Sequence, residues 1–138
     1  MLIELGGAID VPHFSIEYSA NLEDMVDIAA LCDHLRRAAI ETGVFLVPGI
    51  RVRAFRAAHV SIADGDDKHA FLDLSVRLRG GRDLDTRKRA TDHIFKALQA
   101  FMAPALARHS IALSMEMRDI DPDLSPKTGT IRDHLKET

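Results

Sequence analysis

Hydrophobic and polar residues alternate along four stretches of the chain, at residues 13–19, 50–55, 72–79 and 111–117. In the first stretch Phe14, Ile16 and Tyr18 share one face, and the residues between them are polar. Side chains of a strand point alternately to its two faces, so this period is typical of a strand with one buried face. The pattern therefore predicts four half-buried strands.

Apolar residues at helical spacing separate the first strand from the second and the third from the fourth. The first helical segment follows Asn21, a favourable N-cap residue with Asp24 in the position of a capping box, and it ends at Gly43. The second follows Asp83, and Pro104 is expected to kink this helix or to end its regular part. The sequence thus predicts strand–helix–strand twice.

Each strand–helix–strand unit favours two parallel strands joined by a right-handed crossover. Two such units predict an α/β (α+β) fold in which one four-stranded sheet carries both helices on one face. The length of 138 residues suits a single domain. The other face of so small a sheet needs a cover, so we expect the chain to form a homo-oligomer.

The composition narrows the classes of function. Eighteen Lys and Arg against 21 Asp and Glu give a formal net charge of −3, which argues against general nucleic-acid binding. No apolar run is long enough to cross a bilayer, so no membrane partner is expected. The single cysteine, Cys32, excludes an intramolecular disulfide and a multi-cysteine metal site, and a cytoplasmic location is predicted.

Common cofactor and nucleophile motifs are absent from the sequence. The seven histidines form no H-x-x-x-H pair, so we expect no metal site, and no glycine-rich nucleotide loop occurs. Guanidinium groups bind carboxylates through two parallel hydrogen bonds, so clustered arginines favour a small substrate with several carboxylates. The alternative interpretation is a set of solvated charges at strand edges. The arginines concerned are Arg51, Arg53, Arg56, Arg77, Arg79 and Arg82.

Several segments resemble one known family. Residues 12–21, PHFSIEYSAN, are similar to the start of 5-carboxymethyl-2-hydroxymuconate isomerases, members of the tautomerase superfamily. The similarity extends from Pro12 to about Leu135. Further matching segments are TGVF at 42–45, GIRVR at 49–53, ADG at 63–65, GGR at 80–82, TRK at 86–88 and IDP at 120–122.

The resemblance implies a tautomerase-like tandem β-α-β repeat assembled as a homotrimer. It also implies a cofactor-free Δ-isomerase that interconverts the dienol and conjugated keto forms of an unsaturated polycarboxylate in homoprotocatechuate (aromatic) degradation. Pro12 would be the catalytic acid and base, and Arg51 and Arg82 would hold the carboxylates and the carbonyl or enolate oxygen. Arg53, on the same strand face as Arg51, and His13, next to the proline, rank below them as site residues.

A proline can move a proton only if its nitrogen is an amine. An α-amine titrates at about pH 8, and nearby arginines and partial burial lower its pKa towards neutrality, where a base is most effective. In the sequence as it stands, however, the Pro12 nitrogen is a tertiary amide joined to Val11. Residues 1–11 are therefore expected to be an extension that the mature protein lacks, and residues 12–138 a single isomerase domain.

Three hypotheses address the extension. Translation can start at Val11 from a GTG codon, after which the initiator methionine is removed; this is the preferred explanation. Proteolysis can instead remove the extension. If the extension is retained, Pro12 is blocked and the chain would be a catalytically silent trimeric binding protein. A related tautomerase with another carboxylate substrate is a further alternative.

Overall fold

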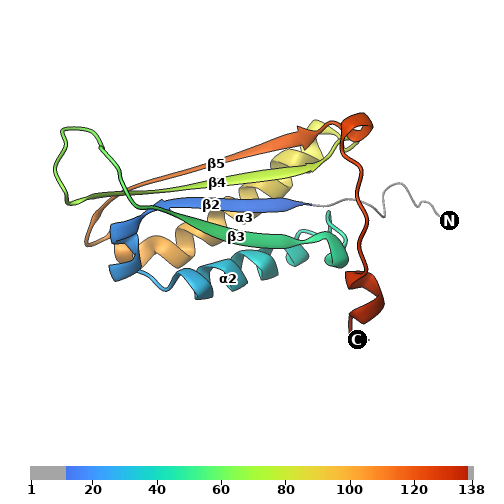
Figure 1. The fold of residues 1–138 in the computed structure, drawn as a ribbon, viewed down its shortest axis with the longest axis horizontal. Coiled ribbons are helices and arrows are strands. Elements are labelled where there is room, and N and C mark those ends of the chain that lie inside the picture. The colour runs from blue at the N-terminus through green and yellow to red at the C-terminus, as the bar shows by residue number, and fades with distance from the viewer. Residues whose placement is uncertain (1–11, 137–138) are drawn as a thin grey trace.

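The computed structural model describes residues 12–136, which form one sheet and two α-helices (Figure 1). Short 3₁₀ helices lie at Ala20–Asp24, Val47–Gly49, Pro122–Leu124 and Ile131–His134. Both predicted strand–helix–strand units are confirmed. The main elements are, in chain order, β2 (His13–Ser19), α2 (Ile28–Glu41), β3 (Arg51–Ala57), β4 (His69–Arg79), α3 (Leu84–Leu106) and β5 (Ser110–Ile120).

The strands are ordered β3-β2-β4-β5 across the sheet. β2 is parallel to β3 and β4 is parallel to β5, so each unit has the expected parallel pair. The two units join in the middle of the sheet, where β2 and β4 are antiparallel. Figure 1 shows both helices on the same side of the sheet, which confirms the predicted four-stranded fold.

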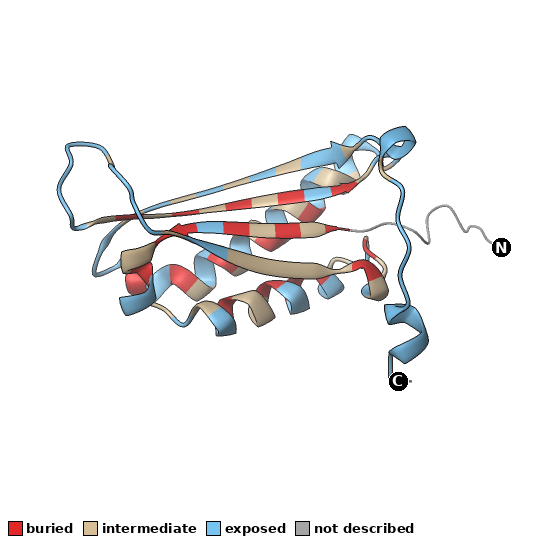
Figure 2. Cartoon of the chain, in the orientation of Figure 1, coloured by how far each residue is buried: buried red, intermediate tan, exposed pale blue. Residues whose placement is uncertain are grey.

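The hydrophobic core lies between the sheet and the helices. Figure 2 shows buried and less buried residues alternating along β2 and β4. Each large apolar side chain that is fully buried contributes roughly 1.5–3 kcal/mol, and a one-residue slip of a strand would expose its whole apolar face. The alternation therefore sets the strand register. The buried side chains include Phe14, Ile16 and Tyr18 of β2, Leu72, Leu74 and Val76 of β4, Leu31 and Leu35 of α2, and Ile94, Leu98 and Met102 of α3.

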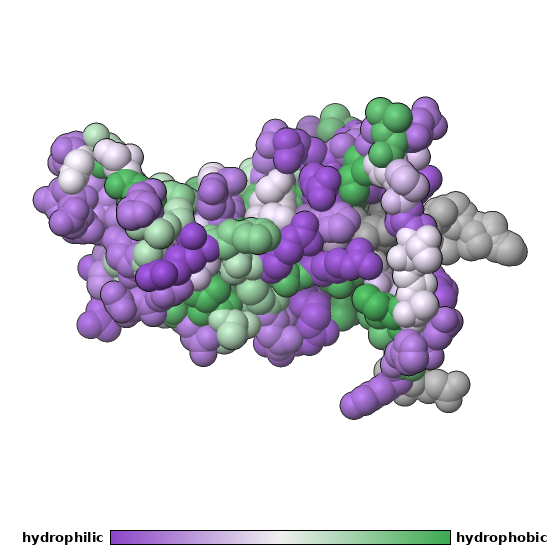
Figure 3. Space-filling view, in the orientation of Figure 1, coloured by the Kyte–Doolittle hydropathy of each residue, from purple (hydrophilic) through white to green (hydrophobic). Residues whose placement is uncertain are grey.

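The face of the sheet opposite the helices, called here the open face, carries the polar half of the alternation. Ser15 and Glu17 lie on it in β2, and Asp73 and Ser75 are their partners in β4. Phe55 of β3 lies on the same face and is 55% exposed. Figure 3, in the orientation of Figure 1, shows mainly hydrophilic side chains with smaller apolar patches between them.

The prediction that Asn21 caps the first long helix is wrong. Residues Ala20–Asp24 form a 3₁₀ helix, and α2 begins only at Ile28, where the Asp27 carboxylate accepts a hydrogen bond from the Ala30 N–H. Asn21 instead uses its side-chain amide to donate to the carbonyl oxygens of Asp67, at 3.3 Å, and His69, at 2.9 Å. A long-range bridge to the start of β4 has thus replaced the local cap.

The other helix ends agree more closely with the predictions. Gly43 follows α2 with a φ of +69°, a left-handed conformation that favours glycine and stops the helix. The Asp83 carboxylate accepts a hydrogen bond from Thr86 N–H and caps α3 as predicted. Pro104 lies within the last turn of α3, which continues to Leu106, so the helix does not end at the proline itself.

Candidate anion-binding site

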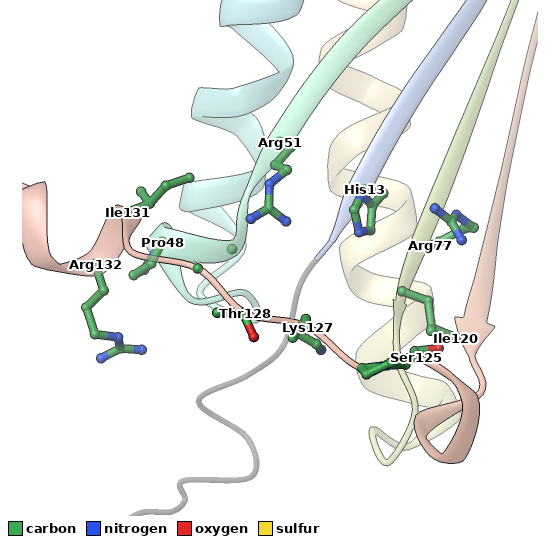
Figure 4. A pocket seen from close by; sticks show the side chains of 13 residues that line it. His13, Pro48, Arg51, Arg77, Ile120, Ser125, Lys127, Thr128, Ile131 and Arg132 are labelled. Atoms are coloured by element: carbon green, nitrogen blue, oxygen red, sulfur yellow. The ribbon is translucent and has the colours of Figure 1, made fainter.

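A pocket of about 590 Å³ lies at the end of the sheet where β2 and β3 begin and β5 ends. The C-terminal segment, defined here as residues 125–132, crosses this end and forms the outer wall (Figure 4). The lining residues therefore come from the sheet, from the turn before β3 and from the chain after β5. They are His13, Pro48, Gly49, Arg51, Arg77, Ile120, Ser125, Pro126, Lys127, Thr128, Gly129, Ile131 and Arg132.

Strand register places the basic residues of the pocket side by side. His13 at the start of β2 is the partner of Arg51 in β3 and of Arg77 in β4. All three residues lie at positions whose side chains point to the open face, so the three side chains project from the same face of the sheet. Figure 4 shows the imidazole between the two guanidinium groups, and Lys127 on the C-terminal segment that crosses this end of the sheet.

The charge of this pocket is opposite to that of the whole chain. Four cationic side chains line it, from Arg51, Arg77, Lys127 and Arg132, and no Asp or Glu is among its described lining residues. The full chain carries a net charge of −3, so this concentration of positive charge is local. A concave site lined by guanidinium and ammonium groups attracts anions and orients carboxylates. The pocket is therefore an anion-binding site by its chemistry.

His13 is held neutral in this surrounding. Arg53 Nη1 lies 3.2 Å from His13 Nδ1. Burial, followed by the positive charges of Arg53, Arg77, Arg51 and Lys127 in that order, lowers the pKa of His13 from 6.5 to about 4. At neutral pH the imidazole therefore adds a polar, uncharged group to a cationic pocket.

Pro12 lies directly before the pocket residue His13 and is buried. Its carbonyl oxygen accepts a hydrogen bond from the backbone N–H of Arg51 at 3.3 Å, so the pairing of β2 with β3 begins at the proline. Pro12 itself is not among the residues that line the pocket. Residues 1–11, on which the predicted extension falls, lie outside the described part of the chain.

The other predicted site residues occupy different positions. Arg53 lies two residues beyond Arg51 on the same face of β3 and reaches the site through His13. Arg82 is half-buried in the connection between β4 and α3, after Gly81, whose φ is +112°. It lies outside the set of lining residues. Within the described chain the pocket thus brings together His13 and Arg51, but not Arg82.

Sequence reasoning missed part of this pocket. Arg77 belongs to the arginine cluster, and its strand period places it on the open face, but it is not among the predicted site residues. Lys127 and Arg132 come from a polar C-terminal stretch that has no strand or helix period. Only the basic side chains themselves, in a segment after a predicted turn, could have indicated a role there.

Two further features of the described residues bear on the class of protein. Among residues 12–136, no group of three or more His, Cys, Asp or Glu side chains lies together in a way that could hold a metal ion. Neither of the two described α-helices combines the length and hydrophobicity that spanning a bilayer requires.

The tandem β-α-β repeat, with an anion pocket at one end of the sheet, has the tautomerase-like fold. A solved structure of a fused 4-OT symmetric trimer shares the fold, with a TM-score of 0.59 and 13% identity. That alignment covers 84% of this chain and 93% of the other.

The 5-carboxymethyl-2-hydroxymuconate isomerase family model matches residues 12–135, so the chain belongs to this family of isomerases. A 5-carboxymethyl-2-hydroxymuconate Δ-isomerase of Escherichia coli is 27% identical over 121 residues, which cover 88% of this chain and 96% of that protein. The crystal structure of a 5-carboxymethyl-2-hydroxymuconate isomerase from Deinococcus radiodurans R1 aligns with a TM-score of 0.85 at 27% identity, covering 94% and 97% of the two chains.

Proposed function

We propose that the protein is a 5-carboxymethyl-2-hydroxymuconate Δ-isomerase of homoprotocatechuate degradation. It would interconvert the dienol and conjugated keto forms of an unsaturated polycarboxylate without a cofactor. The observation that carries the proposal is the cationic pocket beside the start of β2, whose described lining residues include no Asp or Glu, in a chain of this isomerase family. A substrate with several carboxylates is the natural ligand of such a pocket.

In the proposed mechanism Pro12 is the acid and base. Its amine nitrogen takes the hydroxyl proton of the dienol. The C–O bond of the substrate becomes a carbonyl, and the conjugated electron pair shifts along the carbon atoms of the substrate. The resulting ammonium returns the proton to the distal carbon. An α-amine pKa of about 8 is lowered by adjacent cations, and Arg51 and Arg77 lie beside the neighbouring residue His13.

The arginines would stabilise the negative charge that develops on oxygen. Arg51 lines the pocket and is proposed to hold a substrate carboxylate. Arg82 is carried over from the resemblance, as a ligand of a second carboxylate or of the enolate oxygen. It follows the end of β4, and Arg77 of that strand lines the pocket. Fixed guanidinium groups lower the energy of an enolate-like transition state because they need no reorganisation.

This mechanism requires a chain that begins at Pro12. With Val11 attached, the nitrogen is an amide without a usable lone pair, so the active form would consist of residues 12–138. We also propose that the active form is a cytoplasmic homotrimer, in which the open face is covered by neighbouring copies.

The experiment compares two forms of the protein with the dienol substrate. The form that begins at Pro12 is made by expression from Met-Pro, with the methionine removed, and the second form retains residues 1–11. We expect the shorter form alone to accelerate ketonisation, measured by ultraviolet absorbance. Pro12→Ala in the shorter form is expected to lose at least ~100-fold in kcat, in the range for lost acid–base catalysis.

Intact mass and N-terminal sequence of the protein made from its own upstream DNA decide which form is native. A native chain that starts at Met1 and has no ketonisation activity would overturn the proposal and favour the catalytically silent binding protein. Ketonisation of other unsaturated carboxylates, without activity on this dienol, would identify a related tautomerase instead.

A further inference from the structure

The contact between Arg53 and His13 determines where the imidazole carries its proton. Arg53 Nη1 is 3.2 Å from Nδ1, and a guanidinium has only donors, so Nδ1 must accept. A neutral imidazole that accepts at one nitrogen has its proton on the other. His13 in this structure is therefore the tautomer protonated at Nε2.

The surroundings of the ring keep it in this neutral form. Arg51 and Arg77 are its partners on the two neighbouring strands, and Lys127 lines the same pocket from the C-terminal segment. A second proton on the ring would add a positive charge beside four cationic side chains. That proton would also have to occupy Nδ1, which already accepts a hydrogen bond from Arg53. His13 is half-buried and lines the pocket in which a carboxylate would bind.

We propose that His13 binds the substrate as a neutral hydrogen-bond donor through Nε2–H, and that Arg53 is the positioning residue that sets this tautomer. The proposal rests on the proposed function, because the acceptor would be a carboxylate or enolate oxygen of the same polycarboxylate. A neutral imidazole gives up its N–H proton only to a very strong base. It can therefore stabilise negative charge next to Pro12 without competing for the proton that Pro12 transfers.

The first test observes the tautomer directly. Protein labelled with ¹⁵N-histidine is studied by long-range ¹H–¹⁵N correlation from about pH 5 to 8, and the His13 signals are assigned by their loss in His13→Gln. We expect widely separated nitrogen shifts, with the proton on Nε2 across this range. In Arg53→Gln the two shifts should move towards each other because the glutamine side chain is shorter and Nδ1 loses the guanidinium donor. Arg56→Gln is the matched control, since Arg56 on the same strand pairs with Glu23 at 3.4 Å.

The second test uses a dicarboxylate that cannot react. Adipate is titrated into the labelled protein, with butyrate as the monocarboxylate control. Hydrogen bonding to a carboxylate should move the Nε2–H proton downfield with adipate, and less with butyrate. The response should be reduced in Arg53→Gln and retained in Arg56→Gln.

The third test separates a donor from a structural residue by kinetics in the form that begins at Pro12. A glutamine amide reaches about as far as Nε2, whereas an asparagine amide reaches only about as far as Nδ1. His13→Gln should therefore keep kcat/KM within a few-fold, whereas His13→Asn and His13→Ala should lose about 10- to 100-fold, the usual effect of removing a hydrogen bond to a charged group.

The outcomes distinguish this inference from the proposed function. A His13 that titrates near its ordinary pKa, carries its proton on Nδ1, or behaves identically in Arg53→Gln would overturn the inference even if ketonisation is fast. Equal losses in His13→Gln and His13→Ala would do the same. If ketonisation is absent but adipate still shifts Nε2–H, the inference stands as an anion contact and the isomerase proposal fails.

Discussion

At the scale of single residues, the site depends on what surrounds each side chain more than on its type. His13 is an ordinary strand residue by pattern, yet burial and neighbouring cations lower its pKa to about 4. The strand pattern places Arg53 on the polar face, yet its guanidinium donates a hydrogen bond to the His13 ring that lines the pocket. These roles arise because parallel and antiparallel pairing puts β3 and β4 on either side of β2.

The depressed pKa of His13 predicts a pH dependence of stability. The unfolded chain binds a proton at His13 near pH 6.5, whereas the folded chain binds it only near pH 4. The unfolded state therefore holds more protons between these values, so the free energy of unfolding falls as the pH is lowered through this window.

Urea unfolding at several pH values from 7 to 4 measures this effect. The His13→Gln variant lacks the titrating imidazole. Its free energy of unfolding should therefore decrease less than that of the wild type as the pH falls from 6.5 to 4. His59→Gln, at an exposed position in the β3–β4 connection, is the control and should follow the wild type. Parallel curves for wild type and His13→Gln would contradict the shifted pKa.

At the scale of elements, long-range hydrogen bonds decide where the first helix begins. Ser19 Oγ accepts from Phe71 N–H and donates to the Asn21 side-chain oxygen, while the Asn21 amide donates to two carbonyls before and at the start of β4. Ser19 is fully buried, so these partners satisfy a polar group inside the protein. The start of β4 is thereby fastened to the end of β2.

Asn21→Ala should destabilise the fold by about 1–3 kcal/mol, because it removes these bonds and leaves their partners unsatisfied. Asp24→Ala is the matched control, because Asp24 is exposed and would matter only if it belonged to a capping box. Its effect should stay within about 0.5 kcal/mol. Urea unfolding of both variants at pH 7 measures the difference, and equal losses would favour the local cap that the sequence suggested.

At the scale of the whole molecule, both α-helices of the described chain cover the same face of the sheet. The open face carries polar residues and Phe55, which is 55% exposed in the single chain. An aromatic side chain in that position gains free energy when a second copy covers it. The proposed homotrimer would supply that cover.

Phe55→Glu tests this assembly. Light scattering coupled to size exclusion should give a trimer for the wild type and monomers for Phe55→Glu, because a carboxylate would be buried at the interface. Leu84→Glu is the control, since Leu84 is similarly exposed at 56% but lies at the start of α3, away from the open face. Trimers of both variants would place the interface elsewhere.

The fold was largely predictable because the hydrophobic patterns and helix-end residues that indicate it lie within short segments, and the same strand–helix–strand pattern occurs twice. Alternating residues such as Phe14 and Ile16 predict the buried strand face, and Gly43 and Asp83 mark helix ends through their own backbone and side-chain chemistry. The site was predictable only in part. Arg51 and His13 lie in a matching family segment and line the pocket, whereas the resemblance placed no role on Lys127.

Within residues 12–136, the sequence by itself determined the order of the strands and of the two long helices, since a hydrophobic period depends only on residues a few positions apart along the chain. It also indicated an anionic ligand through its clustered arginines. Only the tertiary structure decided that His13 lies between Arg51 and Arg77, that Asn21 bridges to β4, and that the C-terminal segment closes the pocket. These facts are pairings between residues about 40 or more positions apart along the chain, and neither period nor local propensity contains them.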